Sequence, residues 1–481
     1  MSRRVLLACA TAMLAVFGLQ ATRAESAAIR LFELLAPEAV TEPAALVEAA
    51  AAVSAADVHA LAAAGAATLV GRADGITALM PVAAFNGDPA VAQALIDAGA
   101  DPAAREANGW SAILYAAAFN RNPEVVQVLL DGGAAPRTGG ATAIVPHLWV
   151  PGYHAVLDRV AELQRRGTLP VASTHGGETA LLLAAAYNGN AAVVRTLTAA
   201  GADVRRADVD GSTALLYAAW FNRSVAVHRT LLKTGADTTA RDNRARTALI
   251  AAATGNPNPE VVQTLLEAGA EVSARDELGF TALMAAAANH RSPAVVRMLL
   301  HAGADLHARN GRGRTPLMEA AENNRSPTVI EALLDAGADV AARDETFSMT
   351  PLMFAAWDSE RASVVRALLN AGADLHARDR DGWTALMHAA VYNIHQDSPA
   401  VVGALLAAGA DVDAVDDVEG YTALMWAANH GEIPAVVHAL LDAGADPAVR
   451  GRNGETAATL MASNEPLRRT SAYRRLIESP P

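Results

Sequence analysis

Methionine and histidine recur at regular positions of this sequence, and both side chains can bind metal ions. Five methionines occupy one position of a phrase that repeats through the second half of the chain, namely Met284, Met318, Met353, Met387 and Met425. Thioether sulfurs suit copper(I), but stacked helices lie about 8 to 10 Å apart, so neighbouring sulfurs are too distant to share an ion. His307 and His376 share a position two copies apart, which separates them further. We therefore interpret the methionines as core residues and expect no metal site in either row.

A second set of side chains that could bind a ligand interrupts the repeated phrase. These side chains are His147, Trp149, Tyr153 and His154. Prolines at positions 146 and 151 break a helix here, so residues 146–154 are expected to form a protruding loop. The loop could hold a metal ion or a small ligand, or its aromatic rings could fill a gap left by a distorted helix. The sequence leaves both interpretations open.

Motifs of catalysis are absent from the sequence. It contains no GxSxG, HExxH, P-loop or dinucleotide-binding glycine pattern. The only cysteine is Cys9, and cleavage of the export signal described next would remove it together with any cysteine-based metal site. The formal net charge of −13 opposes binding to nucleic acid, which needs a basic face. We expect no catalytic residue, no cofactor and no bound metal.

The first 24 residues have the layout of a secretory signal peptide. Arg3 and Arg4 precede an apolar run from Val5 to Leu19, and small residues follow, so cleavage is predicted after Ala24. A Sec-type signal is favoured over the twin-arginine and lipoprotein types. The apolar run is shorter than the roughly 20 residues that a membrane helix needs. We expect the mature chain in the periplasm or outside a bacterial cell, without stable membrane insertion.

Two ladders of residues predict the organisation of the rest of the chain. Glycines recur every 34 residues at Gly65, Gly99, Gly133, Gly167, Gly201, Gly235, Gly269, Gly303 and Gly337, and continue with short insertions at Gly372, Gly409 and Gly444. A Thr-Ala-Leu or Thr-Pro-Leu signal keeps step with them at Thr77, Thr179, Thr213, Thr247, Thr281, Thr315, Thr350, Thr384 and Thr422. Such periodicity indicates a stack of small units that share one core. The spacing predicts about twelve units and a short end piece.

Within one unit, the residues from Thr179 onward predict two helices and an extended arm. Thr179 lies where an N-cap belongs, and a helix rich in alanine and leucine follows. Asn188 is expected to end this helix in the left-handed conformation, which asparagine tolerates. Gly201 ends the second helix, and a turn at Asp210-Gly211 closes the arm. The slot of Asn188 holds asparagine in other units, at Asn86, Asn120, Asn222, Asn256, Asn324 and Asn393.

The heads TALM or TPLM and the tails LLxAGAD resemble those of the ankyrin repeat. The resemblance covers residues 43–478 and implies an all-α repeat, a solenoid of about twelve helix-turn-helix units with β-hairpin arms. Two departures stand out. The unit has 34 residues, where that family has about 33. The family's histidine after Thr-Pro-Leu is replaced by Met, Leu or Ile, so its hydrogen bond to threonine should be absent.

The two ends and one interior unit depart from the pattern. Residues 25–42 are expected to form a short lead-in helix, 43–73 a degenerate N-terminal repeat and 453–478 a polar C-terminal cap. A cap is expected because each end of a stack has one face without a neighbour. Residues 138–175 are expected to form an irregular repeat that contains the proline loop, in which AVLDRVAEL restores the second helix.

One slot of the unit, directly before the threonine, varies more than the others. Its large apolar members are Trp110, Phe280, Met349, Trp383 and Tyr421. Variation inside a rigid repeat indicates surface released from packing, and in the resembled family this slot lies at the hairpin tip on the concave binding side. Large apolar residues on an exposed rim are enriched at binding hot spots. We predict that these five residues contact a protein partner. Alternatively, each side chain covers the neighbouring arm.

Together these features predict an exported scaffold that mediates protein–protein interaction and has no intrinsic catalysis. We expect an unidentified protein partner, no nucleic acid, and a monomer in solution. The alternative from a different class is a metal or small-ligand carrier that uses residues 146–154. The resemblance to exported bacterial ankyrin proteins also suggests an accessory factor that supports a periplasmic stress-defence enzyme.

Overall fold

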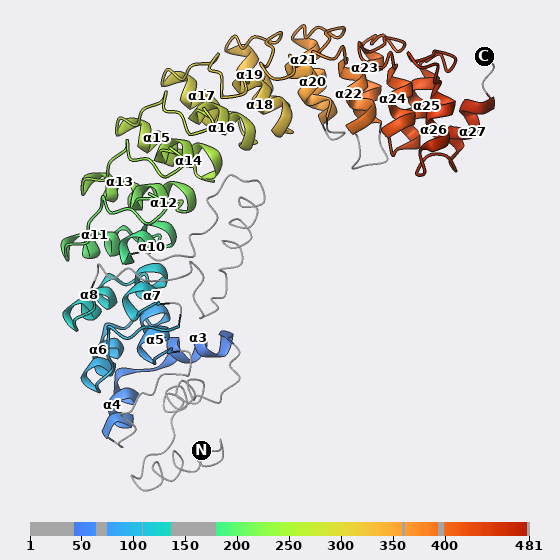
Figure 1. The fold of residues 1–481 in the computed structure, drawn as a ribbon. Coiled ribbons are helices and arrows are strands. Elements are labelled where there is room, and N and C mark those ends of the chain that lie inside the picture. The colour runs from blue at the N-terminus through green and yellow to red at the C-terminus, as the bar shows by residue number, and fades with distance from the viewer. Residues whose placement is uncertain are drawn as a thin grey trace. The chain divides into compact units, whose positions relative to one another are not determined.

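The computed structural model describes residues 43–63, 75–107, 109–135, 179–357, 361–392 and 399–478. In these residues the chain forms 24 α-helices and no strand (Figure 1), which confirms the predicted all-α repeat. The predicted signal peptide, lead-in helix and irregular repeat, at 1–24, 25–42 and 138–175, lie outside the described residues and stay predictions.

The chain divides into two compact units, Met1–Ala252 with Asn256–Ala270 and Ala253–Gly255 with Glu271–Pro481. The first helices of the repeats up to this division are α3 (Pro43–Ala52), α5 (Leu79–Phe85), α7 (Ala112–Phe119), α10 (Ala180–Tyr187), α12 (Ala214–Phe221) and α14 (Ala248–Gly255). The second helices are α4 (Ala55–Ala63), α6 (Pro89–Asp97), α8 (Pro123–Asp131), α11 (Ala191–Ala199), α13 (Val225–Lys233) and α15 (Pro259–Glu267). Helices of one kind pack on their own kind in the next repeat, as α10 does on α12 and α11 on α13.

The second unit has the same construction. Its first helices are α16 (Ala282–Asn289), α18 (Pro316–Asn323), α20 (Pro351–Ala355), α22 (Ala385–Tyr392), α24 (Ala423–His430) and α26 (Ala457–Ser463). Its second helices are α17 (Ala294–His301), α19 (Pro327–Asp335), α21 (Ala362–Asn370), α23 (Ala400–Ala407), α25 (Pro434–Asp442) and α27 (Ser471–Glu478). Successive first helices and successive second helices are in contact from α16 to α27.

The core consists of small apolar side chains on the facing sides of these helices. In α10 every residue from Ala180 to Ala186 is buried, and in α11 the buried residues include Val193, Val194 and Leu197. A helix that is apolar on all sides must have neighbours on all sides. A first helix inside the stack, such as α10, therefore depends on the repeats before and after it, whereas the second helices each keep an exposed face.

Threonine caps the first helices as the sequence predicts. The Thr179 hydroxyl accepts a hydrogen bond from the backbone N–H of Leu182 at 3.4 Å. The same bond recurs at Thr213, Thr247, Thr281, Thr315, Thr384 and Thr422. The methionine that replaces histidine contributes more than apolar packing, because the Met318 sulfur accepts the backbone N–H of Thr315 at 3.4 Å. Sulfur is a weak acceptor, so this bond is a modest substitute for a histidine.

Six of the asparagines expected at this position end described first helices, and none of these six is left-handed, so that expectation is wrong for Asn86, Asn120, Asn188, Asn222, Asn256 and Asn324. Asn393 lies outside the described residues. Asn188 has φ −89° and ψ 119°, which is extended backbone. Its side-chain amide instead donates to two backbone carbonyls of the preceding helix pair, those of Ala117 at 3.0 Å and Asn120 at 2.7 Å. Its oxygen accepts the N–H of Asn190 at 3.0 Å. The asparagine therefore connects one repeat to the next, and an extended backbone is what directs its amide there.

Two helix pairs that are far apart in the sequence are immediate neighbours in the stack. α10 packs on α7 and α11 on α8 (Figure 1), although residues 136–178 separate them along the chain. The bonds from Asn188 to Ala117 and Asn120 span this junction in the same register as the bonds between ordinary repeats. The pairs α7–α8 and α10–α11 thus contact each other as successive repeats do elsewhere in the first unit.

Candidate functional site

The five residues predicted to form an exposed binding rim are largely covered. Trp110 is 0% exposed, Met349 1% and Tyr421 6%, while Phe280 and Trp383 are half-buried. The expectation of an exposed rim is therefore wrong for Trp110, Met349 and Tyr421, while the predicted contact of the five residues with a protein partner stays a prediction. The residue directly before the threonine differs between repeats because it packs against different neighbours, and not because it is free of contacts.

The hairpin geometry explains why the slot is buried. In the hairpin 379–383 the N–H of Asp379 donates to the carbonyl of Trp383 at 3.0 Å, and the N–H of Trp383 donates to Oδ1 of Asp379 at 2.8 Å. Gly382 between them has φ +82°, a conformation that reverses the chain and favours glycine. The slot residue thus points back over the first helices, where the Trp383 ring lies 4.3 Å from that of Trp426 and 5.1 Å from that of His388.

Trp110 shows the same arrangement in the first unit. Its ring centroid lies 5.0 Å from that of Tyr115 and 6.4 Å from that of Phe119, both on α7. Aromatic pairs at such distances add stability beyond the area they bury. The alternative interpretation, in which each side chain covers adjacent structure, describes the slot better than a free rim does.

The start of several hairpins is bonded to the first helix by a polar contact whose chemistry differs between repeats. The Tyr217 hydroxyl donates to Asp208 at 2.7 Å, and the Trp426 indole N–H donates to Asp416 at 2.9 Å. Asn310 donates its amide to Glu319 at 2.9 Å. In two repeats the ring directly before the threonine packs on this helix residue, as Tyr421 does on Trp426 and Trp383 on His388.

One of these bonds brings a histidine and a carboxylate together, as some catalytic sites do. His388 Nε2 lies 2.9 Å from Asp379 Oδ2, and the indole N–H of Trp357 donates to His388 Nδ1 at 3.0 Å. Nδ1 must therefore accept, so the proton of the neutral ring lies on Nε2 and is donated to Asp379. Both ring nitrogens are occupied and the side chain is only 7% exposed. The arrangement holds a helix to its hairpin and offers neither a free base nor a nucleophile.

Glu319 is a buried carboxyl beneath the slot residue Arg314. Burial, followed by the nearby charge of Glu322, raises its pKa from 4.5 to about 7. The Arg314 guanidinium pairs with Glu322 and lies over the Phe354 ring at 4.4 Å. These charges neutralise one another within the second unit, so the cluster is structural.

The residues that are exposed lie on the other side of the hairpin turn. Large apolar side chains occur at hairpin tips in Val209, Leu278, Phe347 and Val418, with exposures of 51%, 63%, 48% and 52%. We use "tip" for the residues between the Asp, Asn or Gly that begins a hairpin and the residue of positive φ that reverses it. Sequence reasoning missed these residues because it took the position after the glycine as the tip. The sequence feature that could have indicated these exposed residues is an apolar residue one or two positions before the residue that reverses the hairpin.

Consecutive tips are held in register by backbone hydrogen bonds in the second unit. The N–H of Gly311 donates to the carbonyl of Leu278 at 2.8 Å, and that of Arg380 to the carbonyl of Phe347 at 2.7 Å. A Cβ on Gly279 would lie 2.9 Å from the nitrogen of Gly311, so only glycine allows this close approach without a shift. The apolar tip side chains thus stand on a rigid base.

Arginines along the hairpin edge strengthen the same base. Nη1 of Arg309 donates to the carbonyls of Gly313 and Arg343, at 2.6 and 2.8 Å. The first bond lies within its own hairpin and the second reaches the next repeat. Arg275 and Arg343 make the corresponding pair of bonds. The hairpins of residues 275–383 are therefore connected by side chains as well as by backbone.

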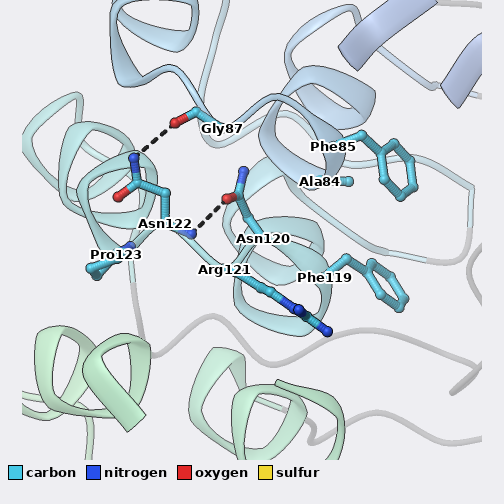
Figure 2. Close-up of a pocket in the computed structure, with 8 residues that line it drawn as sticks. All are labelled: Ala84, Phe85, Gly87, Phe119, Asn120, Arg121, Asn122 and Pro123. Carbon is cyan, nitrogen blue, oxygen red and sulfur yellow. Dashed lines mark hydrogen bonds between the residues drawn. The ribbon is translucent and has the colours of Figure 1, made fainter. Parts of the chain in front are cut away.

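A shallow pocket of about 590 Å³ lies at the ends of α5 and α7 in the first unit (Figure 2). It is lined by Ala84, Phe85, Gly87, Phe119, Asn120, Arg121, Asn122 and Pro123. The Asn122 amide is already used, because it donates to the Gly87 carbonyl at 2.8 Å and accepts the Glu124 N–H at 3.0 Å. What remains for a ligand is the pair of rings of Phe85 and Phe119, whose centroids are 6.3 Å apart, and the Arg121 side chain. The pocket has no set of polar groups that would select one small molecule.

Among the described residues no group of three His, Cys, Asp or Glu side chains is arranged to hold a metal ion. The loop candidates His147, Trp149, Tyr153 and His154 lie outside those residues, and their assignment stays a prediction. A search of the described helices finds none that is both long and apolar enough to cross a membrane.

Comparison with known proteins gives one family. The family model for ankyrin repeats in three copies matches residues 46–138, 157–242, 226–310, 249–344, 283–379, 317–416, 352–451 and 395–479. These overlapping matches include most of the chain and all of the hairpin tips described above. No curated protein matches the sequence.

Proposed function

Because the chain belongs to the ankyrin-repeat family, whose repeats mediate protein–protein interaction, we propose that it is an exported scaffold that binds another protein through its hairpin tips. It has no catalytic activity of its own. Its place is the periplasm or the cell exterior, which rests on the signal-peptide layout of residues 1–24.

The exposed apolar tips are the observation that supports this proposal. Leu278, Phe347 and Val418 are each about half exposed or more, on hairpins whose backbones are hydrogen-bonded to their neighbours. Large apolar side chains on a soluble surface mark sites of interaction when they share one face. Because the hairpins are already ordered, this chain loses little additional conformational entropy when a partner binds.

A capture experiment tests the assignment of the tips. The purified chain would be immobilised and exposed to periplasmic extract, alongside a variant with Leu278→Ser, Phe347→Ser and Val418→Ser. We expect the wild type to retain a partner and the tip variant to lose it. The matched control is Ile477→Ser in α27, which removes a side chain of similar exposure, 56%, that is not on a hairpin.

Equal capture by the tip variant and the wild type would refute the role of the tips. Loss of capture in the Ile477→Ser control would instead indicate a general dependence on surface apolarity. Metal analysis of the purified chain, repeated with His147→Ala and His154→Ala, tests the carrier alternative. A stoichiometric ion that disappears in that variant would favour the carrier over the scaffold.

A further inference from the structure

One second helix of the first unit carries a histidine in the core. His228 lies on α13 and is 0% exposed. The other second helices from α6 to α25 hold an apolar residue at this position, and each of these residues is also 0% exposed: Ala92, Val126, Val194, Val262, Val296, Ile330, Val365, Val402 and Val437. The position is therefore a packing position, and among these helices α13 alone fills it with a group that can take up a proton.

The hydrogen bonds of the ring determine which nitrogen carries the proton. Nδ1 of His228 lies 2.9 Å from the backbone carbonyl oxygen of Ser224. A carbonyl can only accept, so Nδ1 carries the proton of the neutral ring and donates it. Nε2 is buried, and the described residues place no hydrogen-bond donor on it. The neutral ring thus has one satisfied nitrogen and one lone pair that faces no donor.

No charged side chain of the packed helices compensates a proton at this position. α13 packs on α11, α12 and α15 (Figure 1). The charged residues of these four helices and of the loop before α13 are all exposed, namely Arg195, Arg223, Arg229, Lys233, Glu260 and Glu267. The titratable residue of α12 is Tyr217, whose hydroxyl donates to Asp208. A charged imidazole would therefore have only the backbone carbonyls of Ser224 and Ala218 to support it.

Burial makes the charged form of His228 unfavourable. Loss of hydration is the largest influence on the ring and lowers its pKa from 6.5, and the carbonyls of Ser224 and Ala218 oppose this only in part. A locally opened chain therefore binds a proton more readily than the closed chain below pH 6.5. The stability from the neutral ring is fully present above pH 6.5 and is lost as pH falls toward the pKa of the buried ring.

We propose that α12 and α13 form an acid-labile repeat of the first unit, which is closed at neutral pH and opens locally when His228 takes up a proton. The charged imidazole leaves the core for solvent, and α13 has to separate from α12 to release it. Each repeat of a stack is held by its neighbours, so a repeat that opens also removes contacts from the repeats on both sides. Histidine suits this role because its charge changes near neutral pH.

The second unit responds to pH in the opposite direction. Burial, followed by the charge of Glu322, raises the pKa of Glu319 to about 7, so the second unit gains stability as pH falls through this value. Acidification thus loosens a repeat of one unit and stabilises the other unit. The inference does not depend on the proposed binding of a partner, since it concerns the closed state of one repeat and not the hairpin tips.

Hydrogen exchange of the full chain, followed by mass spectrometry of peptides from residues 214–233, tests the proposal. Exchange would be measured between about pH 5 and about pH 8 and divided by the rate of an unstructured peptide at the same pH. We expect the opening of α12 and α13 to increase as pH falls below 6.5, by up to about tenfold per pH unit for one proton. Peptides of α5 and α6, where Ala92 takes the position of His228, are the internal reference and should show no such increase.

His228→Val is the matched variant, because valine occupies this position in most of the other repeats. Its exchange below pH 6.5 should be slower than that of the wild type and should lack the increase. His228→Gln keeps a polar side chain that does not titrate, and its exchange should be independent of pH. The chemical shift of the His228 Cε1–H reports protonation directly, since its signal is absent from both variants.

Three outcomes would overturn the proposal. The first is a His228 signal that titrates at pH 6.5 or above. The second is an increase of exchange at low pH that persists in His228→Val. The third is an equal increase in α5 and α6, which would indicate a general effect of acid on the unit. Capture of a partner by the hairpin tips, or its failure, leaves all three measurements unaffected.

Discussion

The residues on either side of the hairpin glycine differ in their exposure to solvent, and the sequence alone does not predict this difference. Leu278 precedes Gly279 and is 63% exposed, whereas Phe280 follows it and is half-buried. In the next apolar hairpin Phe347 is 48% exposed and Met349, two residues later, is 1% exposed. Both positions vary from repeat to repeat, yet the one before the turn faces solvent and the one after it is half-buried or buried.

The comparison teaches that variation within a repeat protein has two physical sources. At an apolar tip, the contact with the next hairpin is made by the backbone carbonyl and not by the side chain, as in the bond from the N–H of Gly311 to the carbonyl of Leu278. The type of side chain can therefore change without loss of this bond. After the turn, the side chain packs on a first helix whose own residue changes with it, as Trp110 packs on Tyr115 and Trp383 on His388. Variation alone therefore does not identify a surface.

The largest effect is expected from a substitution at the buried position after the turn. Trp110→Ala should destabilise the chain by about 3 to 5 kcal/mol, because the ring is fully buried and its removal leaves a cavity beside Tyr115 and Phe119. Denaturant unfolding of the variant measures the loss. The tip variant Leu278→Ala should change stability by less than about 0.5 kcal/mol. If the two variants lost equal stability, the distinction between the two sides of the turn would fail.

A smaller effect is expected at Glu319, the buried carboxyl beneath Arg314. Because the pKa of Glu319 is about 7 in the folded chain and 4.5 for a solvated glutamate, the folded chain binds more protons between these values. Stability from this group is fully present below pH 4.5 and is lost as pH rises through about 7, by at most about 3 kcal/mol. Glu319→Gln should remove that pH dependence and be the more stable form above pH 7. Denaturant unfolding between pH 4.5 and 8 would show it, and an unchanged profile would indicate an exposed carboxyl.

The asparagine that connects repeats gives a third test, at a slot that is buried and constant over several repeats. Asn222 donates to the carbonyls of Ala185 and Asn188 at 2.9 and 2.8 Å. Asn222→Ala leaves both buried carbonyls without this donor and should cost about 2 kcal/mol. The control is Asn243→Ala, because Asn243 is an exposed tip residue with a single side-chain bond to Val209. Equal losses in thermal unfolding would contradict the connecting role of Asn222.

The smallest effect concerns the turn itself. Ser348 occupies the glycine position of its hairpin with φ 64°, which is unfavourable for a residue with a Cβ. Ser348→Gly should stabilise the second unit by about 1 kcal/mol and leave the exposure of Phe347 unchanged. The reverse change Gly279→Ser should destabilise it, because its Cβ would meet the nitrogen of Gly311 at 2.9 Å. Differential scanning calorimetry of both variants would detect opposite shifts of Tm, and shifts of the same sign would reject the argument.

Features that repeat locally were predictable from the sequence. The period of the glycines and threonines predicted the helix pairs, and the threonine caps of the first helices confirm the local chemistry. The conformation of Asn188 was not predictable in this way. Its backbone is extended because its amide must reach Ala117 and Asn120, which belong to a different repeat.

The candidate site was predictable only in part, for the same reason. The sequence placed the variable residues on the hairpins, but which side of Gly382 faces solvent depends on hydrogen bonds between Asp379 and Trp383. Burial of Trp110 likewise depends on rings that lie on the following helix. Such contacts between repeats are not encoded in the sequence of one repeat.

The direct contact of α10 with α7 has a consequence for the energetics of chain closure. In an ordinary arm, ten residues lie between Ala202 and Thr213, whereas 44 lie between Ala134 and Thr179. Loop-closure entropy rises only with the logarithm of length, so in general a fourfold longer flexible connection costs only about 1.2 kcal/mol more to close. Two helix pairs of such a stack can therefore be neighbours in space without being neighbours in the sequence.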